Sequence, residues 1–180
     1  QTVIHNTGSN TKQNTAVTAF DGAAVEFNAD STELHAASSG ADTSIITVAN
    51  TAGNNYGSTI KFNSAETLIK AEGVKTATGV YTDRYSATHF TKATTSHLHA
   101  ASQNSDAYAL LNGGKTNING AVNLHAVTGA GDAMGLVSRY EVSGLEFGRD
   151  SSGKVTTAAG SNLNINVEAG SGRVMGVMAH

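Results

Sequence analysis

The sequence predicts an all-β protein: a short-strand β-sandwich or an irregular β-solenoid built from degenerate repeats, with at most one short helix. Three observations predict this class. The 180 residues contain no proline, so every peptide N–H can donate to a strand ladder. Short apolar runs alternate with clusters of Gly, Asn and Ser that suit tight turns. The tripeptide Leu-His-Ala also recurs, each time with an aspartate at the same distance.

Residues 1–19 form the first unit and are polar except for a few small or apolar residues, among them the adjacent pair Val3 and Ile4. This composition predicts an N-terminal arm or an exchanged strand, followed by a β-rich domain over residues 20–180. We expect Val3 and Ile4 to be the assembly residues, docking on a neighbouring subunit. Because the first residue is Gln1, we also expect a processed form or a fragment.

Short strands are expected along the rest of the chain. The segment Asn162–Glu168 alternates strictly, with Leu163, Ile165 and Val167 on one face and asparagines on the other, as in a half-buried strand. The strands are predicted at Ala23–Phe27, Ser44–Ala49, Thr59–Phe62, Gly79–Tyr85, Ala107–Leu111, Ala121–Ala126, Met134–Val142, Leu163–Glu168 and Arg173–Met178. The segment Ser64–Gly73 fits a capped helix and a strand equally well.

An internal repeat underlies this pattern. The three Leu-His-Ala copies begin at Leu34, Leu98 and Leu124, and in each an aspartate follows eight residues after the leucine. Aligning a later glycine adds two weaker copies, so the repeats start near residues 34, 68, 98, 124 and 165. Such units bury one face against their neighbours in a stack.

The repeats carry a resemblance to a known class of proteins. In GAGDAMGLVSRYEVSG (Gly129–Gly144), small residues precede a glycine, which is followed by an apolar run and then Arg-Tyr. The earlier segment QNSDAYALLNGG (Gln103–Gly114) has a similar pattern, with Ala109 at the glycine position. These units resemble the irregular β repeats of tail-fibre and other structural proteins of bacteriophages. The resemblance extends over about residues 34–180. It implies a β-rich, oligomeric, non-enzymatic structural role and carries over no functional residues.

A second resemblance concerns the N-terminal arm. Chains rich in Ala, Thr, Asn and Gly with a detached first strand are similar to strand-donating pilin subunits, which complete the sheet of a neighbour. The cysteine pair usual in pilins is absent from this chain. Both resemblances imply that the partners of the protein include copies of itself.

The charge composition argues against several classes of function. Lys and Arg total 11, Asp and Glu total 14, and charged residues make up only 14% of the chain, well below the usual quarter. No basic cluster exists to bind nucleic acid, and no apolar run is long enough for a membrane-spanning helix. We therefore expect no nucleic-acid partner and no membrane insertion. A surface of such low charge suits packing into an assembly.

The seven histidines are the first candidates for chemistry. His97 and His99 lie two residues apart, and with His125 they could supply three nitrogens to a zinc or nickel ion. The alternative, which we prefer, is a column of polar side chains, because His35, His99 and His125 occupy the same repeat position. No metal and no other cofactor is therefore expected.

The acidic residues are the second group. Asp42, Asp106 and Asp132 recur in Gly- and Ser-rich turns, where we expect them to cap the turns rather than to bind calcium. Asp21, Glu26 and Asp30 could supply an acid pair for glycoside hydrolysis, but the chain has no tryptophan for a sugar groove. No catalytic residue is assigned, and we expect no enzyme.

The sequence thus predicts a non-enzymatic structural protein, a self-assembling subunit of an extracellular filament or virion appendage. The alternative is an adhesin or carbohydrate-binding surface module that contacts a host-surface glycan or receptor. Either role implies an extracellular, cell-surface or virion location.

Overall fold

The regular structure of the chain is entirely β. The computed structural model describes residues 1–9, 12–53, 56–91, 94–138 and 153–179, and within these ranges there are eighteen strands, β1–β18, and no helix. The all-β prediction is confirmed. In the segment Ser64–Gly73 the helical alternative is wrong and the strand alternative is confirmed, because Glu66–Gly73 forms β8.

The strands form three sheets in which neighbouring strands run parallel. Sheet A consists of β1 (Thr2–Thr7), β5 (Ser31–Ser38), β8 (Glu66–Gly73), β11 (Thr95–Ser102), β14 (Ala121–Thr128) and β17 (Asn162–Ala169). Sheet B consists of β2 (Gln13–Asn14), β6 (Ser44–Asn50), β9 (Ala77–Thr82), β12 (Ala107–Asn112), β15 (Ala133–Ser138) and β18 (Val174–Ala179), with β3 (Val17–Ala19) also paired to β6. Sheet C consists of β4 (Ala24–Phe27), β7 (Thr59–Phe62), β10 (Ala87–Phe90), β13 (Lys115–Ile118) and β16 (Lys154–Thr157).

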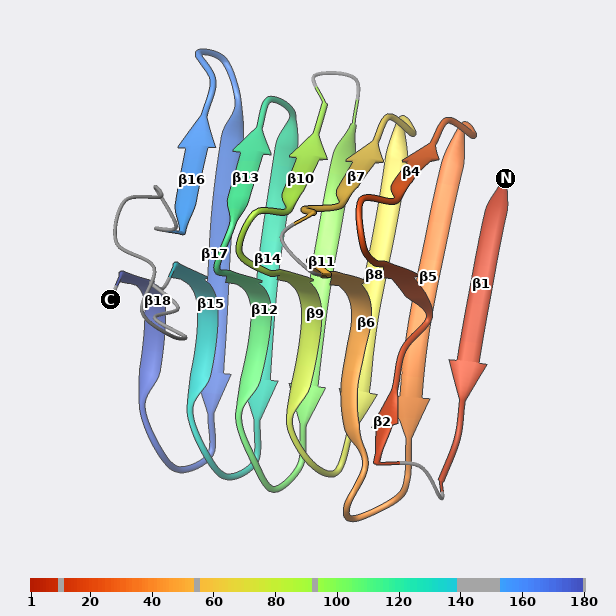
Figure 1. Ribbon diagram of the computed structural model, residues 1–180. Coiled ribbons are helices and arrows are strands. Elements are labelled where there is room, and N and C mark those ends of the chain that lie inside the picture. The colour runs from red at the N-terminus through yellow and green to blue at the C-terminus, as the bar shows by residue number, and fades with distance from the viewer. Residues whose placement is uncertain (10–11, 54–55, 92–93, 139–152, 180) are drawn as a thin grey trace, which may run out of the picture.

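The chain visits the three sheets in turn, and each return to a sheet adds one strand beside the previous one (Figure 1). We call one passage through sheets A, B and C a coil. The result is a solenoid-like stack with β1 at one end and β17 and β18 at the other. In this stack contacts join each coil mainly to the coils before and after it.

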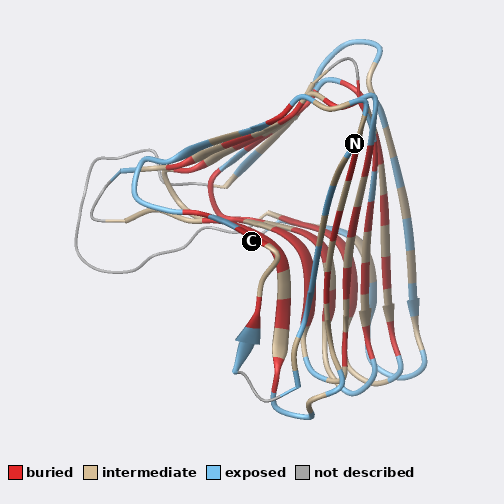
Figure 2. Cartoon of the chain, turned by 90° about the vertical axis from the view of Figure 1, so that its right-hand side faces the viewer, coloured by how far each residue is buried: buried red, intermediate tan, exposed pale blue. Residues whose placement is uncertain are grey.

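The interior of the stack is built from rows of similar side chains, one from each strand at the same register position. The central row of sheet A is aliphatic throughout and consists of Ile4, Leu34, Ile69, Leu98, Leu124 and Ile165. Burial alternates along the strands of this sheet, as Figure 2 shows. Each fully buried Leu or Ile contributes about 1.5–3 kcal/mol, so this row is a major source of stability.

Four of the five predicted repeat starts lie in this central row of sheet A. Leu34, Leu98, Leu124 and Ile165 share the row, as the alignment requires, whereas Leu68 lies one position earlier and Ile69 takes its place. A one-residue slip turns a side chain to the other face of a strand. Leu68 accordingly lies on the outward face of β8.

Sheet C adds an aromatic stack to the core. Phe27, Phe62 and Phe90 occupy one register row, and their ring centroids lie 5.3 and 5.1 Å apart with nearly parallel planes. Phe62 and Phe90 are fully buried. The constant parallel register explains the stack, because it places identical side chains directly over one another.

The strands of sheet B bend at a position held by small residues. Ala109 and Leu110 are consecutive, yet both belong to the buried core, so the strand departs from simple alternation there. Gly79 and Gly135 take the equivalent place in the adjacent coils, between register pairs on either side. A Cβ on Gly135 would lie 2.2 Å from Cγ2 of Ile165, so at Gly135 the bend brings sheet B too close to sheet A for a side chain.

A buried polar row follows the same strands toward sheet C. Asn50, Thr82, Asn112 and Ser138 share one register position. Asn50 Nδ2 donates to the carbonyl of Ala87 at 2.8 Å, and Thr116 Oγ1 donates to Asn112 Oδ1 at 2.9 Å. These bonds satisfy backbone and side-chain groups where the chain leaves sheet B.

The structure describes all or part of two further predicted segments, the N-terminal arm and the strand expected at Met134–Val142. Residues 2–7 of the expected arm form β1, which pairs with β5 of the same chain; exchange of this strand between subunits stays a prediction. The strand expected at Met134–Val142 is β15 as far as Ser138, and the remainder lies outside the described residues. None of the described segments forms a helix with the length and hydropathy needed to cross a membrane.

Candidate functional site

The outward face of sheet A carries a row of basic and polar side chains. The row contains His5, His35, Lys70, His99, His125 and Asn166 in consecutive strands. Its members alternate with the buried aliphatic row, so they point away from the core. The predicted common position of His35, His99 and His125 is thereby confirmed, and His5 joins them.

Glutamates from the same face contact this histidine row. His35 Nε2 lies 2.8 Å from Glu72 Oε2, and His99 Nε2 lies 4.0 Å from the other oxygen of the same carboxylate. His5 Nε2 lies 3.1 Å from Glu33 Oε1 at the N-terminal end of the row. The carboxylates therefore place negative charge directly beside the row of imidazole rings.

His99 and His125 form a closer pair within the row. Their Nδ1 atoms lie 3.1 Å apart, and His125 Nε2 lies 3.6 Å from Glu168 Oε1. Burial lowers the pKa of His99 below its ordinary value, and the positive charge of a protonated His125 lowers it further. A hydrogen bond between the two Nδ1 atoms requires one ring to be neutral and to accept through Nδ1 while the other donates.

The structure separates the three metal candidates only partly. His99 and His125 lie side by side, while His97 belongs to the next outward row, beside Asn123 on β14. Within the described residues no group of three or more potential ligands is placed to hold a metal ion. The register places His99 and His125 in the outward row described above.

Two of the turn aspartates connect successive coils. Asp106 Oδ1 accepts the backbone N–H of Asp132 at 2.8 Å, and Asp132 Oδ1 accepts the backbone N–H of Arg173 at 2.9 Å. The guanidinium of Arg173 also donates to Asp132 Oδ2, and these hydrogen bonds lower the pKa of Asp132 below its ordinary value. These hydrogen bonds run to the next turn, whereas an Asx-turn would close within its own turn. Asp42 lies exposed in the turn before β6.

The acids considered for hydrolysis are arranged differently. Glu26 lies on the outward face of β4, where Lys61 Nζ donates to it at 2.7 Å. This hydrogen bond lowers the pKa of Glu26. Asp21 adopts a left-handed backbone conformation in the turn before β4, with φ of 55°. Glu26 is therefore held as an ionised partner of Lys61, which does not suit a general acid.

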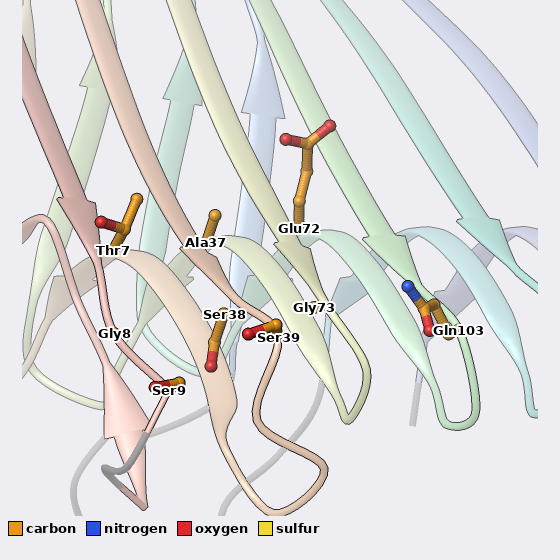
Figure 3. A pocket seen from close by; sticks show the side chains of 9 residues that line it. All are labelled: Thr7, Gly8, Ser9, Ala37, Ser38, Ser39, Glu72, Gly73 and Gln103. Carbon is orange, nitrogen blue, oxygen red and sulfur yellow. The ribbon is translucent and has the colours of Figure 1, made fainter.

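A hollow lies where β1, β5 and β8 end (Figure 3). Its volume is about 540 Å³, and it is open to solvent. Its lining is polar or small: Thr7, Gly8, Ser9, Ala37, Ser38, Ser39, Glu72, Gly73 and Gln103. The hollow could hold a small polar molecule, but it offers no aromatic side chain on which a sugar ring could stack.

At the two ends of the stack, the last described strand of each sheet has a neighbouring described strand on one side only. Among the described strands, sheets A and B end at β1 and β2 on one side and at β17 and β18 on the other, and these edges have no further strand beside them. Val174 and Val177 of β18 are 51% and 62% exposed, although their counterparts Ala133 and Leu136 in the preceding coil are buried. The C-terminal end therefore presents core-type side chains and an unpaired backbone edge to solvent.

The predicted assembly residues lie at the opposite end. Val3 is on the outward face of β1 and is 49% exposed, whereas Ile4 points inward and packs against the core. The two residues therefore cannot present one continuous apolar surface. Docking of Val3 and Ile4 on a neighbouring subunit stays a prediction, and the edge of β1 is a further feature available to a partner.

Sequence reasoning missed His5 and the exposed valines of β18. His5 was detectable, because Ile4-His5 repeats the Leu-His of Leu34-His35. The exposure of Val174 and Val177 was not, because it depends on which strand is last in the stack. In comparisons with protein-family models, curated proteins and solved structures, no match to this chain was found.

Proposed function

We propose that this protein is a non-enzymatic structural subunit that self-assembles into an extracellular filament or virion appendage. The finer fold that we infer is an irregular β-solenoid rather than a β-sandwich. All three sheets are parallel, and from β5 to β16 each coil adds one strand to each sheet, which supports this choice.

The observation that carries the proposal is the open C-terminal end of the stack. No other described strand pairs with the outer edges of β17 and β18, and Val174 and Val177 expose apolar surface that the same positions bury in the preceding coil. Long flat edges of this kind associate with other strands unless charge, proline or a covering segment prevents it. The chain has no proline, and its low content of charged residues gives little repulsion between copies.

The proposal is tested by sedimentation velocity of the full chain over a wide range of concentrations, followed by negative-stain electron microscopy. We expect the mean sedimentation coefficient to rise with concentration and elongated particles to appear. A single monomeric species at every concentration would contradict self-assembly.

A second candidate function is an adhesin or carbohydrate-binding surface module, and two exposed aromatic residues favour it. Phe20 and Tyr56 are 58% and 69% exposed. They come from neighbouring segments, since a Cβ built on Gly22 would contact the Cβ of Tyr56 at 3.6 Å. Exposed aromatic rings are suitable platforms for sugars. A glycan array should then give saturable hits that the double variant Phe20→Ala/Tyr56→Ala loses; an array without hits argues against this function.

A further inference from the structure

We propose that copies of this chain join head to tail. The N-terminal edge of one copy consists of β1 in sheet A and of β2 and β3 in sheet B. This edge would pair with the C-terminal edge of another copy, β17 and β18, in continuous parallel sheets A and B. This inference rests on the proposed self-assembly and names the interface that produces it.

The backbone edges are complementary. Residues of a parallel strand bond alternately to the neighbour on each side. Gly8 N donates to Ala37 O, so the even-numbered residues of β1 bond to β5, and the peptide groups of Val3, His5 and Thr7 point outward.

The outer edge of β17 supplies the matching set of groups. Asn162 N donates to Gly120 O and Gly170 N to Thr128 O, which assigns the even-numbered residues of β17 to β14. The peptide groups of Leu163, Ile165 and Val167 are thereby directed away from the stack. The outward peptide groups of β17 can therefore form parallel-sheet hydrogen bonds with the outward peptide groups of β1 in another copy.

The interior rows also continue across this junction. Ile165 and Ile4 belong to the same register row, and so do Val177 and Val17 in sheet B. Docking would bury the exposed side chain of Val177 against an apolar neighbour. The flanking row pairs Val167 with Asn6, whose Nδ2 donates to Thr15 O of its own chain at 2.7 Å.

Charge complementarity favours the same partner. Inside the chain, Glu72 lies between two histidines of adjacent strands, at 2.8 Å from His35 and 4.0 Å from His99. Glu168 occupies the corresponding position on β17 and contacts a histidine on one side only. Head-to-tail docking places His5 of the next copy on its other side and completes the repeated arrangement.

The alternative tail-to-tail pairing lacks these matches. It would make the junction antiparallel and would bring the Glu168 carboxylates of two copies onto the same junction without a histidine from β1. Among the described strands, the last coil adds β17 to sheet A and β18 to sheet B but none to sheet C, which ends at β16, so the junction is formed by sheets A and B. A heterologous contact that does not close on itself produces an open filament.

Two variants that each block one end provide the test. Val3→Pro removes an outward N–H of β1 without removing a bond to β5, and Val3→Thr is its control. Val177→Lys places a charge on the exposed end of the core, and Val177→Ile is its control. Each blocked variant should raise the concentration needed for assembly at least about tenfold, whereas the controls should assemble like the native chain.

An equimolar mixture of the two blocked variants gives the decisive result. Val3→Pro keeps an intact C-terminal edge (the tail), and Val177→Lys keeps an intact N-terminal edge (the head). The two variants can therefore form one junction, and sedimentation velocity should detect a discrete 1:1 dimer and no longer species. Native assembly combined with a monomeric mixture would overturn the head-to-tail junction but leave self-assembly standing. Dimers of Val3→Pro alone would indicate tail-to-tail pairing, and a monomeric native chain would refute the proposed function as well.

Circular dichroism checks that each variant folds. If Val3→Pro does not fold, Thr7→Pro, which removes a second outward amide of β1, replaces it.

Discussion

At the scale of single residues, polar side chains hold successive coils in register. Asp106 and Asp132 each accept a backbone N–H from the following coil, and the histidine row repeats once per strand along most of sheet A. Such contacts add to the register that the alternation of buried and outward side chains already sets, because a one-residue slip would turn every side chain to the other face. The Leu-His-Ala repeat predicted the histidine positions, but the partners of the aspartates lie too far along the chain to be predicted from spacing.

The first prediction concerns His99. Its pKa in the folded chain lies below the ordinary value of 6.5, chiefly because of burial. The unfolded chain therefore takes up a proton more readily, and the free energy of unfolding contributed by this residue falls as the pH drops below 6.5. We expect His99→Gln to lose less stability than the native chain between pH 7.5 and 5.5.

Urea denaturation at several pH values measures this effect. His97→Gln, an exposed histidine two residues earlier on β11, serves as the control for removal of a histidine. Equal pH dependence in the native chain and in His99→Gln would contradict the burial argument.

The second prediction concerns Asp132. Its lowered pKa reflects hydrogen bonds from Arg173, so the ionised form stabilises the fold above the ordinary value of 3.8, and this contribution is lost as the pH falls through the folded pKa. We expect Asp132→Asn to lower the melting temperature at pH 7 and to differ less from the native chain in acid. Asp42→Asn, in an exposed turn, is the comparison; an equal effect of both changes would contradict a specific role of the Arg173 contact.

At the scale of elements, local alternation predicts some strands and tertiary register decides the others. Asn162–Glu168 was predictable because its apolar residues alternate strictly. Glu66–Gly73 was ambiguous because Leu68 and Ile69 are adjacent, and only pairing with β5 and β11 decides that Ile69 faces the core. That three sheets form, with all their pairings parallel, could not be derived from alternation, which is the same in parallel and antiparallel strands.

The third prediction tests the bend of sheet B. A Cβ on Gly135 would lie 2.2 Å from Ile165 Cγ2 and 2.8 Å from the carbonyl oxygen of Gly176. Relieving these contacts requires the sheets to shift, so Gly135→Ala should lower the free energy of unfolding by about 1–3 kcal/mol. Gly176→Ala is a matched control in the next coil, because its Cβ would be 4.0 Å from the same atom. Equal stability of the two variants would contradict the close approach at Gly135.

At the scale of the whole molecule, a stack of parallel coils has two unlike ends. In this chain the N-terminal end carries outward peptide groups and His5, and the C-terminal end carries Val177 and Glu168. Interior coils satisfy their neighbours on both sides, so the surface available for assembly is concentrated at the ends. This arrangement is the physical reason for proposing a filament subunit with a defined polarity.

Electron cryomicroscopy of assemblies of the native chain tests this proposal most directly. We predict rods in which strands about 4.8 Å apart run across the long axis and sheets A and B continue through each junction. Val177 of one copy should lie beside Val17 of the next. Rods whose copies meet through other surfaces, or native protein that remains monomeric, would contradict the proposal.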